Sequence, residues 1–96
     1  MSEYNQQKPR RSLTATDISA VYSLADRLQP RAFWGRLKRV HTSSIDGFVV
    51  LHPETDLPMY KIGRRLAGGY VAQEDSGREL ASGGTMDDAL QPWYRN

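Results

Sequence analysis

Four short segments rich in β-branched and aromatic residues lie between residues 48 and 83, and glycine or proline punctuates the stretches between them. Segments of this length and composition are typical of β-strands, and the glycines and prolines between them are typical of turns. Because the connections are short, consecutive strands are expected to be neighbours that run in opposite directions. The sequence therefore predicts an antiparallel four-stranded meander sheet over residues 48–83, with strands beginning near Phe48, Met59, Tyr70 and Glu79.

A helix is expected before the sheet, over residues 15–29. Apolar residues from Ile18 to Leu28 recur at the spacing of one helical face. Thr14 followed three residues later by Asp17 is close to a capping-box pattern, and an acidic residue in the first turn suits the positive end of the helix dipole.

Two further helices are predicted. The first covers residues 30–41, because proline is well tolerated at the first position of a helix and apolar residues then follow on one face. Gly35 disfavours this helix, and a strand over 36–42 is the alternative. The other helix covers residues 85–92 and is capped by Thr85.

The predicted order α-α-β-β-β-β-α defines a single small α+β domain over residues 14–96, with the helices covering one face of the sheet. Residues 1–13 are polar and basic, and we expect them to form a flexible tail because they bury too little to offset their ordering entropy. In the second strand, the alternation of side chains places Ile62 toward the core and leaves Lys61 and Arg65 exposed on the opposite face.

The charges divide the chain into a basic half and an acidic half. Residues 1–45 contain eight Lys and Arg against three Asp and Glu, whereas residues 46–96 contain five against eight. A basic half suggests a surface for a polyanion or an acidic partner. The overall charge of +2 is nevertheless far below that of a strongly basic nucleic-acid-binding domain.

Residues that support catalysis or metal binding are scarce or poorly placed. The chain has no cysteine, which excludes disulfides, thiolate nucleophiles and zinc–cysteine sites. His41 and His52 fall on different predicted elements, and the segment 63–69 lacks the Lys-Ser/Thr ending of a phosphate-binding loop. We therefore expect no enzymatic activity, no cofactor and no metal. No apolar run is long enough to span a membrane, so we expect a cytoplasmic protein without a membrane partner.

The sequence predicts a small non-enzymatic binding module. A protein–protein interaction or regulatory accessory protein is the preferred interpretation. Its partner would be another protein or a second copy of the chain. Aromatic residues are favoured at the centres of interfaces, which makes Trp34 and Trp93 candidate anchors provided that they are exposed. Burial of both in the core is the favoured alternative.

Nucleic-acid binding is the other hypothesis. It relies on the basic stretch Arg27–Arg39 and on the end of the second strand, where guanidinium and ammonium groups are available to neutralise phosphates. The candidate contacts are Arg31, Arg36, Lys38, Arg39, Arg64 and Arg65.

Overall fold

The computed structural model describes residues 12–94, so the predicted tail lies outside the described residues except for Ser12 and Leu13. In chain order the elements are α1 (Ala15–Leu28), β1 (Leu37–His41), β2 (Ile45–Leu51), β3 (Pro58–Arg65), β4 (Tyr70–Glu74), β5 (Glu79–Gly83) and α2 (Met86–Tyr94). The strands form one antiparallel sheet in the order β1-β2-β3-β4-β5. The predicted α+β class and antiparallel meander are confirmed, although the sheet has five strands instead of four.

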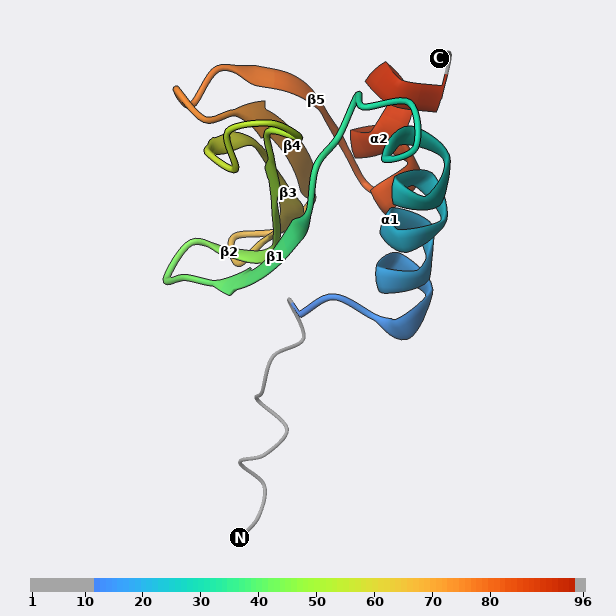
Figure 1. Cartoon of the computed structure of the whole chain (residues 1–96). Coiled ribbons are helices and arrows are strands. Elements are labelled where there is room, and N and C mark those ends of the chain that lie inside the picture. Colours follow the sequence, from blue (N-terminus) through green and yellow to red (C-terminus); the bar gives the residue numbers. More distant parts are fainter. Residues whose placement is uncertain (1–11, 95–96) are drawn as a thin grey trace, which may run out of the picture.

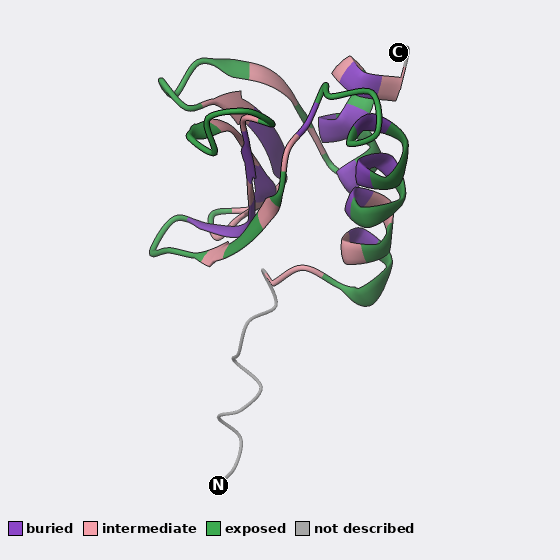
Figure 2. Ribbon diagram, viewed as in Figure 1, coloured by how far each residue is buried: buried purple, intermediate pink, exposed green. Residues whose placement is uncertain are grey.

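Both helices lie on the same side of the sheet (Figure 1). α2 packs against β3, β4 and β5, and α1 packs against α2. Buried residues concentrate between the sheet and the helices (Figure 2). The largest fully buried aliphatic side chains of this core are Val21, Leu24, Leu28, Val50, Ile62 and Leu90.

The helix predicted over residues 30–41 is wrong, because this segment forms a turn followed by strand β1. Ala32 has a φ of 60°, which interrupts helical geometry. Gly35 lies so close to the end of β2 that a Cβ atom would stand 2.5 Å from the carbonyl oxygen of Leu51. The residues that follow pair along β2 and satisfy its outer backbone groups. The alternative strand over 36–42 agrees with β1 to within one residue at each end.

Trp34 and Trp93 both lie in the core, with exposed fractions of 1% and 6%. Their rings contact each other edge to face, with centroids 5.3 Å apart, and the Tyr60 ring packs on Trp93 at 5.1 Å. The exposure required of an interface anchor is therefore not met by either tryptophan, and both rings instead join the sheet to α2 and to the turn after α1.

Tyr70 links the sheet to the beginning of α1. Thr14 and Asp17 form the expected capping box, in which each backbone N–H donates to the other side chain at 3.0–3.1 Å. The Tyr70 phenol donates to Oδ2 of Asp17 at 2.7 Å. Burial and this contact with Asp17 raise the pKa of Tyr70 above its usual value, so the phenol remains a donor.

We expect Tyr70→Phe to lower the free energy of unfolding by about 1–2 kcal/mol, because the buried carboxylate of Asp17 loses a donor. Urea denaturation followed by circular dichroism measures the loss. Tyr94→Phe is the matched control, because the Tyr94 phenol donates to Asp87 at the surface. That control is expected to change stability by less than about 0.5 kcal/mol. Equal losses in the two variants would contradict a special role for the Tyr70 bond.

Candidate functional site

The strands present alternate side chains to the helices and to the opposite side of the sheet. In Figure 1 the β1–β2 hairpin and β5 curve away from the helices, so the side opposite the helices is concave. We call this side the concave face. The pairing register places on it Lys38, Val40, Ile45, Gly47, Val49, Lys61, Gly63, Arg65, Val71 and Gln73.

A pair of glycines lets the sheet curl at the centre of the concave face. Gly47 of β2 is the direct partner of Gly63 in β3. A Cβ atom on Gly47 would stand 2.1 Å from the Ile62 carbonyl oxygen and 2.6 Å from the Cα of Gly63, so the two backbones approach too closely for a side chain. Ile45 and Val71 nearby are only 4% and 1% exposed, although neither helix covers this side. The face is therefore folded into a crease that its own side chains close.

Two hollows open on the concave face, and each combines aliphatic walls with basic residues. The first has a volume of about 350 Å³ and lies at the end of β3 and the beginning of β2; its lining includes Ile45, Val71, Lys61, Arg65, Ser43 and Ser44. The second has a volume of about 470 Å³ and lies over β1 and the end of β2; its lining includes Val40, Val49, Leu51, Lys38, Pro58 and the paired Arg36 and Asp56.

Positive charge predominates on the concave face. Arg65 donates to Glu79 of β5 at 2.9 Å. Lys38 is exposed and Lys61 is half-buried, and neither forms an ion pair within residues 12–94. The aromatic residues of the described strands instead face the helices. The concave face is thus aliphatic and basic, without a ring on which a base or another aromatic group would stack.

The six residues predicted to contact phosphates do not lie on one surface. Lys38 and Arg65 are on the concave face. Arg39 and Arg64 are on the side that faces the helices, and each guanidinium lies over an aromatic ring of the core at 5.3 Å from the ring centroid. The alternation of side chains explains the division, because Arg64 and Arg65 are consecutive in β3 and must point to opposite faces.

The other two of the six lie at the turn after α1 and the approach to β1. Arg36 forms an ion pair with the exposed Asp56, and both residues line the second hollow beside Lys38. Arg31 lies over the ring of the exposed Phe33, with its guanidinium carbon 4.8 Å from the centroid. Lys61, which the sequence places on the exposed side of its strand, completes the basic residues of the concave face; the signal that identifies it is the alternation within β3.

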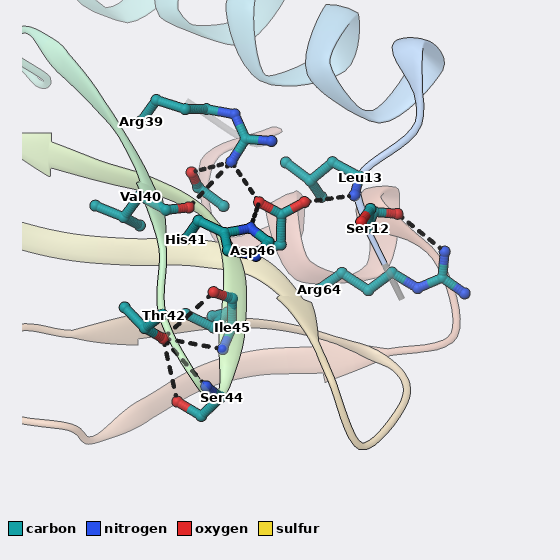
Figure 3. Close-up of polar contacts among 11 residues, drawn as sticks. Ser12, Leu13, Arg39, Val40, His41, Thr42, Ser44, Ile45, Asp46 and Arg64 are labelled. Carbon is teal, nitrogen blue, oxygen red and sulfur yellow. Dashed lines mark hydrogen bonds and ion pairs between the residues drawn. The ribbon is translucent and has the colours of Figure 1, made fainter. Parts of the chain in front are cut away.

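Asp46 is a polar centre on the side of the sheet that faces the helices (Figure 3). Its side chain is 2% exposed. The carboxylate accepts hydrogen bonds from Arg39 Nη1 at 2.6 Å, from the Leu13 amide at 2.8 Å and from His41 Nδ1 at 3.1 Å. Burial opposes its charge, but these bonds, led by the one from Arg39, outweigh burial and lower the pKa of Asp46 to about 2. Asp46 thus ties β1 and β2 to the segment that enters α1.

Within residues 12–94, no three His, Cys, Asp or Glu side chains gather in a way that would hold a metal ion. In the same part of the chain, neither helix has the length and apolar character needed to cross a bilayer. No protein-family model matches the chain, and neither a curated protein nor a solved structure is significantly similar to it.

Proposed function

We propose that this chain is a small non-enzymatic binding module, with a regulatory or accessory role, that recognises a protein partner through its concave face. The observation that carries the proposal is that two hollows with mixed apolar and polar linings adjoin Lys38 and Lys61, which have no ion-pair partner among the described residues. Open apolar surface bordered by polar groups is typical of an interaction site.

The basic residues elsewhere support the choice of this face. Arg36, Arg39 and Arg78 each pair with a carboxylate, and Arg64 donates to the Ser12 carbonyl oxygen while it lies over a core ring. Their side chains are engaged within the domain, whereas Lys38 and Lys61 form no ion pair with a described residue.

Affinity capture from a native lysate tests the proposal with the wild type and two charge-reversed variants. Lys38→Glu with Lys61→Glu alters the concave face, and Arg27→Glu with Arg31→Glu makes the same change in net charge at the end of α1 and the turn after it. We expect the wild type and the Arg27→Glu with Arg31→Glu variant to capture the same protein. The amount captured by the Lys38→Glu with Lys61→Glu variant, the concave-face variant, should be lower by about tenfold or more. Nuclease treatment should change nothing.

Capture that is unaffected by the two lysine substitutions would contradict the role of the concave face. Size-exclusion chromatography of the purified proteins distinguishes a foreign partner from a second copy of the chain, because a homodimer would dissociate in the concave-face variant alone.

Nucleic-acid binding is the second candidate, favoured by the gathering of Lys38, Lys61 and Arg65 on one face. The lack of an aromatic strand residue on this face argues against stacking of single-stranded bases. Fluorescence anisotropy with labelled single-stranded and duplex oligonucleotides measures this activity. Binding at low salt that weakens steeply as salt increases would support it, and absence of binding at low salt would exclude it.

A further inference from the structure

Lys38 and Lys61 stand in one row across the concave face. The register pairs Lys38 with Val49, and Val49 with Lys61, so the two lysines flank a valine on neighbouring strands. Two strand spacings separate their backbones by roughly 10 Å, a distance that about three residues of an extended chain span. Because side chains alternate along an extended segment, carboxylates two or four positions apart lie on one side of it, and the flexible lysine side chains can adjust to either spacing.

The hollows lie beside these cations. The hollow that includes Lys38 has the half-buried Val40 and Val49 on its walls, together with the ion pair of Arg36 and Asp56. The hollow that includes Lys61 has Leu66 and Ala67 as its more exposed apolar residues, because Ile45 and Val71 are buried. Each combines an aliphatic surface with a basic group, which suits a small apolar side chain next to a carboxylate. The crease between them is closed by its own buried residues, so an α-helix about 10 Å wide does not reach its floor, whereas single side chains fit the hollows.

We propose that the partner presents an acidic, extended segment, with two small apolar side chains in the hollows and carboxylates against Lys38 and Lys61. This inference rests on the proposed function and specifies the chemistry of the partner. A protein segment fits better than a nucleic acid because the hollows offer apolar as well as basic groups and the face has no aromatic strand residue. Arg65 is already bonded to Glu79, so the proposal does not require it as a direct contact.

Selection from a displayed library of random heptapeptides tests this proposal without assuming a sequence. The immobilised proteins are the full-length wild type, the Lys38→Glu with Lys61→Glu variant, and the Arg27→Glu with Arg31→Glu variant as the charge-matched control. Thermal unfolding by circular dichroism first establishes that all three are folded. We expect the wild type and the control to enrich peptides with acidic residues on both sides of Val, Ile or Ala.

The enriched peptides are then synthesised and titrated. We expect the two lysine substitutions to weaken their binding by about tenfold or more, and replacement of the peptide's Glu and Asp by Gln and Asn to have a similar effect. Changes in amide chemical shift should concentrate on β1, β2 and β3 in an ¹⁵N-labelled sample.

Four results would overturn the proposal, and they do not all have the same meaning. Enrichment of peptides without acidic residues that still depends on the concave face would reject the acidic segment and leave the proposed function in place. Enrichment unaffected by the lysine substitutions, or no enrichment at all, would reject both. Displacement of the selected peptides by an oligothymidylate at physiological salt, with tighter binding of that strand, would assign the face to nucleic acid.

Discussion

Replacement of Gly47 by alanine is expected to lower the free energy of unfolding by about 3 kcal/mol. The added methyl group would stand 2.1 Å from the carbonyl oxygen of Ile62, and this neighbour is backbone, which has no other rotamer to adopt. Relief requires β2 and β3 to separate at the point where Gly47 pairs with Gly63. Such a separation weakens the hydrogen bonds between β2 and β3, which are both inner strands of the sheet.

Chemical denaturation of Gly47→Ala and of Gly84→Ala measures this effect against a matched control. Gly84 has open space around its Cβ position, so its substitution is expected to change stability by less than about 0.5 kcal/mol. Gly63→Ala should resemble Gly47→Ala, because its added methyl would stand 2.3 Å from the Asp46 carbonyl oxygen. Near-wild-type stability of Gly47→Ala would show that the sheet opens easily and that the crease is not rigid.

The strands after residue 48 were predictable because each has a local signature. β4 and β5 begin at the predicted Tyr70 and Glu79, and β3 begins at Pro58, one residue before the predicted Met59. α2 continues past Pro92 to Tyr94, two residues beyond the predicted end. Hydrophobic periodicity and the positions of glycine and proline predict these elements, because each element is determined mainly by residues that are close in the sequence.

The first hairpin was not predictable in the same way. The sheet predicted from the sequence begins at residue 48 and therefore leaves out Ile45, Asp46 and Gly47. In the fold they begin β2, where the aspartate is buried against Arg39 and the glycine meets Gly63. Both features depend on contacts between strands, and no sequence pattern within β2 predicts such contacts.

The candidate site shows the same division. The alternation of side chains in β3 correctly set Lys61 and Arg65 opposite Ile62, because that rule is local. It does not reveal that Arg64 reaches the carbonyl of Ser12, 52 positions away, or that Arg39 is held by Asp46. Which cations remain available to a partner is decided by these long-range pairings, so a count of basic residues along the sequence cannot identify the binding face.

Acidification from about pH 4 to about pH 2 is expected to remove about 2 kcal/mol of stability that Asp46 supplies at neutral pH. In the folded chain the pKa of Asp46 is lowered from 3.8 to about 2, since the bonds from Arg39, Leu13 and His41 favour the carboxylate despite its burial. A lowered pKa in the folded state means that the contribution is fully present above the unfolded pKa. This contribution is lost as the pH falls through the pKa of Asp46 in the folded state.

The Asp46→Asn variant isolates this contribution from those of the other carboxylates, because every other acidic group is common to both proteins. At pH 7 the variant should be less stable than the wild type by about 2 kcal/mol. The difference should close toward pH 2, where the protonated wild-type side chain resembles the amide. Asp56→Asn is the matched control, since Asp56 pairs with Arg36 at the surface, where solvent screens the pair, and the substitution should change stability little at any pH. If the stability curves of wild type and Asp46→Asn run parallel from pH 7 to pH 2, the tie between the first hairpin and the start of α1 is not electrostatic, and shape alone must hold the two layers together there.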